Sequence, residues 1–161
     1  MVNELNDLIQ DILMSNQGLL TIAIRQRAKF EGWLKFELAQ ALSRKYADIR
    51  VEYHARETNC HIDLYANDAL IELKTPNTNY PNPLCENHTR PITKNITSII
   101  DDIEKLKGFP KKGYIAFVMF PLDSGQAYRQ HTNKVVACLR NHLETIVTIQ
   151  GVPVLVFTGE V

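Results

Sequence analysis

A chain of 161 residues, with 45% hydrophobic and 22% charged side chains, has the size and composition of a globular protein with one core. Lysine plus arginine and aspartate plus glutamate both number 18, so no net charge draws the whole protein onto nucleic acid or a membrane. A polyanion would therefore have to bind a local basic patch.

The chain also has no pattern typical of a targeting or membrane segment. The first residues, Met1 to Asp7, are acidic and lack the apolar core of a signal peptide. The longest apolar run, Ile115 to Phe120, is too short to span a bilayer. Three widely spaced cysteines are typical of a reducing compartment. We expect a single domain over residues 1–161, in the cytoplasm and away from membranes.

The first half of the chain is expected to contain helices followed by a group of strands. Apolar residues at helical spacing predict an N-terminal helical extension within 1–18 and a longer helix over about 20–46. Alternating apolar and polar residues predict three strands, at 49–56, 60–66 and 69–75. A polar loop over 76–90 follows, with three prolines and four asparagines, and loops of this length are often functional.

The second half alternates between helix and strand. A predicted helix opens at Pro91, is capped by Gly108 and carries isoleucines at helical spacing. Residues 113–121 contain an apolar run typical of a strand buried on both faces, and a further helix is predicted from 126 to about 143. A last strand is predicted over 152–158. The order helix-strand-strand-strand-helix-strand-helix-strand predicts an α/β fold, with a mixed sheet of about five strands and helices on both faces.

The hairpin of the second and third predicted strands is the most informative feature. Asn67 and Asp68 tolerate positive φ at its turn, and the resulting register places Asp63 opposite Glu72. Two carboxylates that face one another across a sheet repel, and Lys74 lies two residues beyond Glu72 on the same face. This arrangement is costly for a structural sheet. It suits a hard divalent cation held between two acids, with an ammonium group beside it.

Asp63, Glu72 and Lys74 on adjacent strands, in this order of elements, resemble the signature of the PD-(D/E)xK phosphodiesterase superfamily. The resemblance covers about residues 25–158 and indicates no single family within the superfamily; Ile62 stands where proline is frequent. It implies a restriction-endonuclease-like core and a nuclease that requires Mg²⁺, for which Mn²⁺ would substitute.

The resemblance also implies roles for individual residues. Asp63 and Glu72 would bind the ion through their carboxylates, and the backbone carbonyl of Leu73 would add a ligand. Lys74 would stabilise the charge of the transition state and help orient the attacking water. Because acids nearby favour the ammonium form, Lys74 is not expected to be a free amine at neutral pH.

Many superfamily members carry a further glutamate on the first core helix, directed toward the two strand acids. Glu31 and Glu37 are both candidates in this chain. Helical geometry places Glu31 within the inner apolar stripe and Glu37 at its border. We therefore expect Glu31 to be the catalytic helix acid, although either residue would otherwise be an ordinary surface partner of a neighbouring cation.

Nucleic-acid contacts are expected from the long loop and the helices that flank it. Arginine, lysine and asparagine side chains make many of the contacts to phosphate. The candidates are Arg27, Tyr80, Arg90, Lys94 and Asn95. DNA is the expected substrate, and cleavage of both strands would need a homodimer or a partner subunit. No glycine-rich phosphate loop is present, so no nucleotide cofactor is expected.

Three other interpretations stay open from the sequence. The charged residues of the hairpin would be a charge-compensated strand face in a purely structural protein. A nuclease fold without activity would act as a subunit in nucleic-acid binding or in an oligomer. Zinc is a weaker hypothesis, since Cys85 and His88 have ligand-like spacing but the neighbours Cys60 and His61 point to opposite faces of a strand.

Overall fold

The computed structural model describes residues 1–55, 60–86 and 92–161. The first three helices are α1 (Val2–Ser15), α2 (Gln17–Arg25) and α3 (Glu31–Ser43). Three strands follow, β1 (Ile49–Ala55), β2 (Cys60–Ala66) and β3 (Ala69–Lys74). The remaining elements are α4 (Ile92–Lys107), β4 (Lys112–Met119), α5 (Arg129–Val136), β5 (Asn141–Ile149) and β6 (Val152–Glu160).

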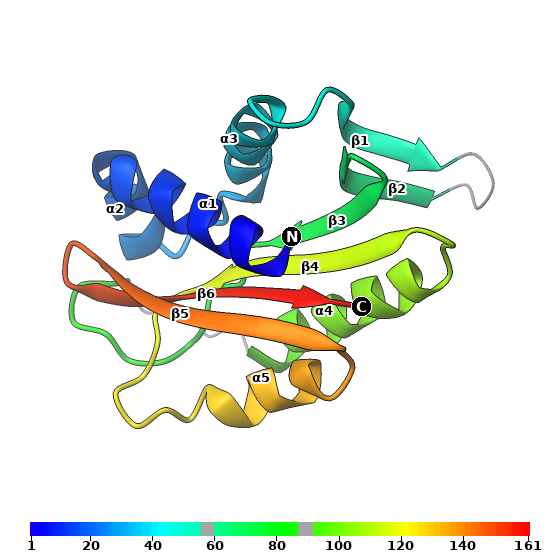
Figure 1. Cartoon of the computed structure of the whole chain (residues 1–161). Coiled ribbons are helices and arrows are strands. Elements are labelled where there is room, and N and C mark those ends of the chain that lie inside the picture. The colour runs from blue at the N-terminus through cyan, green and yellow to red at the C-terminus, as the bar shows by residue number, and fades with distance from the viewer. Residues whose placement is uncertain (56–59, 87–91) are drawn as a thin grey trace.

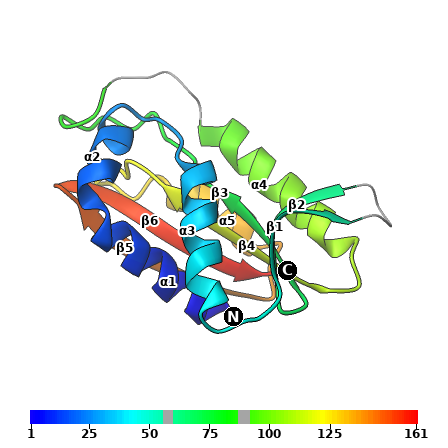
Figure 2. The same ribbon diagram turned by 90° about the horizontal axis from the view of Figure 1, so that it is seen from above.

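These strands form one mixed sheet of six strands in the order β1-β2-β3-β4-β6-β5. Strands β3 and β4 are parallel and joined through α4, whereas the other neighbours are antiparallel. Helices α1, α2 and α3 lie on one side of the sheet, and α4 and α5 lie on the other (Figures 1 and 2). The predicted α/β class, with a mixed sheet and helices on both faces, is therefore confirmed.

The prediction of about five strands was wrong at the end of the chain. Helix α5 ends at Val136, and residues 141–149 form β5, which pairs antiparallel with β6 along its whole length. The turn between these strands has positive φ at Gln150 and Gly151, as a two-residue hairpin turn requires. Leucine, threonine and valine alternate at every second position from Leu143, but this strand periodicity was not recognised, and the helix was predicted to continue to about residue 143.

The predicted helix over 20–46 is broken in two. Arg27 has φ 52°, in the left-handed region, and lies between the end of α2 and the start of α3. Its backbone carbonyl accepts a hydrogen bond from the side chain of Asn77, in the loop after β3. The loop after β3 is therefore held at the turn between α2 and α3, and α3 begins at Glu31.

Two hydrophobic clusters fill the two sides of the sheet. Alternate residues of β4 divide between them: Ala116 and Val118 join the cluster under α1 and α3, and Ile115 and Phe117 join the cluster under α4 and α5. The predicted N-terminal extension contributes to the first cluster, since Leu5 is fully buried there. None of the helices within the described ranges is long and apolar enough to cross a membrane.

Candidate active site

The candidate site lies where β2 separates from β3. The two strands pair from Ala66↔Ala69 to Leu64↔Ile71, beyond which the hairpin of β1 and β2 projects away from β3 (Figure 2). At this point Leu73 N donates a hydrogen bond to Asp63 Oδ2 at 2.9 Å. The Asp63 side chain thus satisfies a backbone donor of β3, and this bond holds its carboxylate at the opening of the sheet.

Strand β1 is distorted opposite Asp63. Glu52 has φ 51°, a conformation that non-glycine residues rarely adopt and that costs on the order of 1–3 kcal/mol. The residue pairs of β1 and β2 on either side of Glu52 keep one register. Leu64 nevertheless packs in the cluster under α1 and α3, whereas Ile62, two residues away on β2, packs with Leu70 and with Leu106 of α4. The distortion therefore changes which side of the sheet these side chains face, and Asp63 lies at the point of change.

Asp63 and Glu72 form a coupled pair of carboxyl groups. Glu72 is only 3% exposed, and burial together with the nearby charge of Asp63 raises its pKa to about 8. Burial also disfavours the charge of Asp63, but the hydrogen bond from Leu73 N, the neighbouring Glu72 carboxyl and the ammonium of Lys35 lower its pKa below the usual value. The two shifts have opposite directions, so the pair keeps a proton to higher pH than two isolated carboxyl groups would, and Glu72 is its more basic member.

A lysine from α3 contacts the Asp63 side of the pair. Lys35 Nζ lies 3.0 Å from Asp63 Oδ1 and also contacts the Glu52 carboxylate. Burial disfavours its charge, but the two carboxylates outweigh that effect and raise the pKa of Lys35. Lys35 thus links α3 to both strands of the distorted hairpin.

A second lysine, from α4, covers the Glu72 side. Lys105 Nζ contacts Glu72 Oε1 and lies 3.6 Å from Asp102 Oδ1 and 3.2 Å from the carbonyl oxygen of His61. Burial opposes its charge, but Glu72 and Asp102 raise the pKa of Lys105. Asp102 and Lys105 are three residues apart on one side of α4, so this helix brings one acid and one cation to the site.

Lys74 lies between the two helices. Its ammonium is 2.9 Å from Asp102 Oδ2 and 3.9 Å from Glu31 Oε1. Burial disfavours the charge, but the surrounding acids, Asp63 among them, outweigh burial and raise the pKa of Lys74. Lys74 is therefore protonated at neutral pH. Burial raises the pKa of Glu31, and Lys74 offsets this in part.

The network has more acids than cations. Five acidic side chains face three lysines, and the members are Glu31, Glu52, Asp63, Glu72, Asp102, Lys35, Lys74 and Lys105. Glu72 Oε1 and Asp102 Oδ2 are buried without a hydrogen-bond partner among the described residues, although lysines lie at ion-pair distance. Lys105 and Lys74 thus contact these oxygens without hydrogen-bond alignment.

The donor chemistry at this opening fits Mg²⁺ or Mn²⁺. In the described part of the chain, no group of three or more His, Cys, Asp or Glu residues is placed to hold a metal ion by itself. Mg²⁺ does not need such a cage, because it keeps several waters and is usually bound by one or two carboxylates plus substrate phosphate. Asp63 and Glu72 supply two adjacent carboxylates. The carbonyl of Leu73 lies on the same side of β3 as the N–H that contacts Asp63.

Two of the predicted nucleic-acid contacts have internal partners instead. Arg27 is 4% exposed, and its guanidinium donates to the carbonyl oxygens of Thr78 and Tyr80, the latter at 2.8 Å. Asn95 Nδ2 donates to the carbonyl oxygen of Asn77 at 2.7 Å. Both side chains hold the loop after β3, and the Arg27 guanidinium is directed to that loop and not to solvent.

The other predicted contacts have different placements. Tyr80 is half-buried beside the cluster under α4 and α5, and burial raises the pKa of its phenol. Lys94 is exposed on the first turns of α4. Arg90 lies outside the described residues, as does His88 of the zinc hypothesis, whereas Cys85 is buried.

Sequence reasoning did not assign site roles to Lys35, Asp102 and Lys105. Lys35 is 8% exposed among the buried leucines of α3, so a lysine within an apolar stripe was the available signal. Asp102 lies directly before the buried residue Ile103 of α4, and Lys105 before Leu106. At about 100° per residue, Asp102 borders the apolar stripe of α4, but Lys105 lies well away from it, so helical geometry gave no signal for Lys105.

The interpretation of these residues depends on their own geometry and chemistry. Comparison with protein-family models, with curated proteins and with solved structures finds no match to the chain. Membership of the PD-(D/E)xK superfamily therefore stays a prediction from the residues and the order of the elements.

Proposed function

We propose that the protein is a nuclease that uses a divalent metal ion to hydrolyse phosphodiester bonds, with DNA as the expected substrate. The observation that carries the proposal is the coupled carboxyl pair of Asp63 and Glu72 at the opening of the sheet, with the protonated Lys74 beside it. Buried charges of this kind cost free energy that a structural sheet would avoid. A site that binds a cation and a phosphate uses both signs of charge.

A restriction-endonuclease-like core is part of this proposal. It is supported by the three antiparallel strands β1 to β3 followed by the parallel crossover through α4 to β4. Glu72, Leu73 and Lys74 lie at the end of β3, where the crossover through α4 begins. The hairpin of β5 and β6 replaces the single last strand that was expected.

The side chains would divide the work of phosphodiester hydrolysis as follows. Asp63 and Glu72 would hold Mg²⁺ or Mn²⁺, with the Leu73 carbonyl as a third protein ligand. When bound, the ion supplies Lewis-acid chemistry that activates water and polarises the phosphate. Lys74 would remain protonated and neutralise negative charge on the phosphate as it develops.

The acids on the two helices would act on Lys74 and on water. Asp102 holds Lys74 from α4, and Glu31 approaches it from α3, so the ammonium is kept in place while substrate binds. Glu31, with its raised pKa, would also hold an ordered water near the carboxyl pair. Glu72 must release its proton before it binds the ion, and Lys105 must move away from its carboxylate.

Metal titration by calorimetry, run in parallel with cleavage of supercoiled plasmid, tests the proposal. The wild type should bind Mn²⁺ and nick the plasmid, and the double variant Asp63→Asn, Glu72→Gln should do neither. Glu104→Gln is the matched control, because Glu104 is an exposed acid on α4 outside the network. Nicking by the double variant, or no Mn²⁺ binding by the wild type, would refute the metal site.

One observation favours a second candidate function, a nuclease-fold subunit without activity. Lys35 and Lys105 already contact Asp63 and Glu72, so the chain neutralises its own carboxyl pair. In such a subunit, Lys105→Gln would leave Mn²⁺ binding absent and nucleic-acid affinity intact. In the enzyme, the same variant would still bind Mn²⁺. Cleavage of both strands would further require two copies, which the mass in solution with and without DNA would detect.

A further inference from the structure

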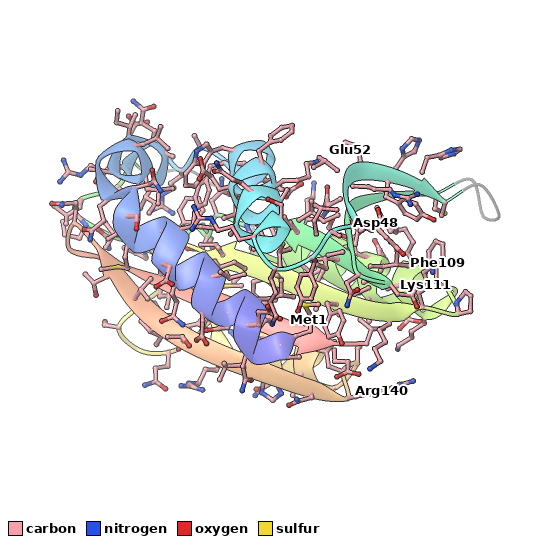
Figure 3. All side chains as sticks on the ribbon, turned by 45° about the horizontal axis from the view of Figure 1, so that its top comes forward. Met1, Asp48, Glu52, Phe109, Lys111 and Arg140 are labelled. Atoms are coloured by element: carbon pink, nitrogen blue, oxygen red, sulfur yellow. The ribbon has the colours of Figure 1, made fainter. Side chains whose placement is uncertain are left out.

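A groove lies beside the candidate active site, on the side of the sheet that carries α4. The segment of β1 from Arg50 to Ala55 lines one wall, and Phe109 and Lys111, in the turn before β4, line the other. Leu70 of β3 also lines it, and the volume is about 550 Å³. Figure 3 shows Glu52 on the hairpin and Phe109 and Lys111 across from it.

Tyr53, Arg50 and Lys111 line this groove, and Tyr65, which does not line it, contacts all three. The rings of Tyr53 and Tyr65 are 4.9 Å apart. The Arg50 guanidinium lies 5.7 Å from the Tyr53 ring and 5.2 Å from the Tyr65 ring, and the Lys111 ammonium lies 5.5 Å from Tyr65. Proteins bind single-stranded nucleic acid with this combination, because bases stack on the rings while cations meet the phosphates.

The two cations can exchange their present partners for phosphate. Arg50 pairs with Asp48 at 2.9 Å, and their side chains are 56% and 48% exposed. Lys111 pairs with Asp68, whose side chain is 73% exposed. Because exposed ion pairs contribute little to stability, a phosphate can displace these carboxylates at low cost.

The groove and Glu72 share strand β3, although neither Asp63 nor Glu72 lines the groove itself. Leu70 lines the groove, and Glu72 follows two residues later on the same strand and the same face, roughly 7 Å away at the usual rise of a strand. On the other wall, Glu52 contacts Lys35, which in turn contacts Asp63. A strand in the groove would thus lie beside the segment of β3 that carries Glu72 and beside Glu52, whose partner Lys35 contacts Asp63.

We propose that this groove binds a single-stranded segment of nucleic acid and leads it to the carboxyl pair. The substrate class of the proposed nuclease is then single-stranded or locally unpaired nucleic acid, so this inference rests on the proposed function for its catalytic part. The physical reason is that a ring can stack only on the face of a base, and in a duplex the neighbouring base pairs cover those faces. A duplex would meet only the cations at the rims.

Fluorescence anisotropy with labelled oligonucleotides, without added metal, tests the groove apart from catalysis. The probes are a 12-nucleotide single-stranded DNA, the RNA of the same sequence and the matched DNA duplex. We expect the single strands to bind about tenfold more tightly than the duplex. The double variant Arg50→Gln, Lys111→Gln should lose about tenfold in affinity. The slope of log affinity against log salt concentration should fall in magnitude by about 1.4, since each contact with a single-strand phosphate contributes about 0.7.

Three further variants separate stacking from charge and from folding. Tyr53→Phe keeps the ring and should bind as the wild type does, whereas Tyr53→Leu should lose at least about fivefold. Lys134→Gln, an exposed cation on α5, is the matched charge control and should have no effect. Thermal melting verifies that each variant is folded.

Each outcome decides a different part of the inference. Equal affinity for duplex and single strand, or unchanged affinity in the double variant, would refute single-strand binding in the groove, even if the wild type cleaves DNA. Preferential single-strand binding without Mn²⁺-dependent cleavage would support the groove and refute the nuclease. Tighter binding of the RNA would support the groove and identify RNA as its ligand.

Discussion

Asp63 and Glu72 form a coupled pair at the opening of the sheet: the pKa of Asp63 is lowered and that of Glu72 is raised to about 8, so Glu72 keeps its proton to higher pH. Facing carboxylates repel when both are charged, and the protein resolves this by keeping Glu72 neutral near pH 7. The same proton must leave before a divalent cation can bind both groups. The relationship therefore links metal affinity, stability and pH.

Metal affinity should rise with pH. Because the pKa of Glu72 is about 8, binding of Mn²⁺ below that pH must displace a proton, and affinity should increase by about tenfold per pH unit between pH 6 and 8. Calorimetry at pH 6, 7 and 8, in buffers of different ionisation enthalpy, measures both the affinity and the proton released. Affinity that does not change over this range would contradict a protonated Glu72.

The stability of the metal-free protein should depend on pH through the same residue. The pKa of Glu72 is raised on folding from 4.5 to about 8, so its contribution is fully present below pH 4.5 and is lost as pH rises through about 8. Glu72→Gln stays neutral and should become more stable than the wild type by on the order of 2–4 kcal/mol between pH 6 and 9. Urea unfolding of both proteins at pH 6 and pH 9 measures the difference. If the free energies of unfolding of the two proteins changed equally with pH, the raised pKa of Glu72 would be contradicted.

Removal of the Lys74 ammonium should abolish turnover and spare metal binding. Lys74→Ala should lower the cleavage rate by about 10²–10³, because the charge that stabilises the transition state is gone. Mn²⁺ affinity should be unchanged or higher, since a cation is removed beside the carboxyl pair. Lys107→Ala, an exposed lysine on α4, is the control. Loss of metal binding in Lys74→Ala would indicate a structural function instead.

Two glutamates on α3 provide a matched comparison. Glu31 approaches Lys74 at 3.9 Å, and Glu37 lies almost two turns further along the helix. Glu31→Gln should reduce the cleavage rate by about tenfold or more with little change in melting temperature, and Glu37→Gln should leave the rate as in the wild type. Equal effects of the two variants would remove Glu31 from the site.

Arg27 should matter for stability. Its buried guanidinium satisfies two carbonyl oxygens in the loop after β3, so Arg27→Ala should lower the free energy of unfolding by about 2–4 kcal/mol. Arg27→Lys should lose most of the same amount, because an ammonium cannot reproduce the guanidinium fork. Urea denaturation measures both, with Arg25→Ala, an exposed neighbour, as control. A stable Arg27→Ala protein with weakened DNA binding would restore the sequence-based expectation.

Local periodicity was enough to predict most of the elements. The hairpin of β2 and β3 turns at Asn67 and Asp68, both at positive φ, with the expected pairing of Ala66 with Ala69 and of Leu64 with Ile71. Such features depend on neighbours within a few residues and are therefore visible in the chain. Strand β5 was missed although its alternation is visible in the sequence, and the break at Arg27 was missed because contacts with the loop after β3 override local helix propensity there.

The spacing along the hairpin predicted that Asp63, Glu72 and Lys74 meet, because alternation on strands determines the direction of each side chain, and the resemblance to the superfamily added Glu31. Only the tertiary structure decided that Lys35 and Lys105 also reach the carboxyl pair, from helices on opposite sides of the sheet. The physical reason is the separation of β2 from β3 beyond Leu64, which lets groups from both sides meet at one opening. Such a meeting of residues distant in sequence depends on the packing of the helices onto the sheet, and no local pattern encodes it.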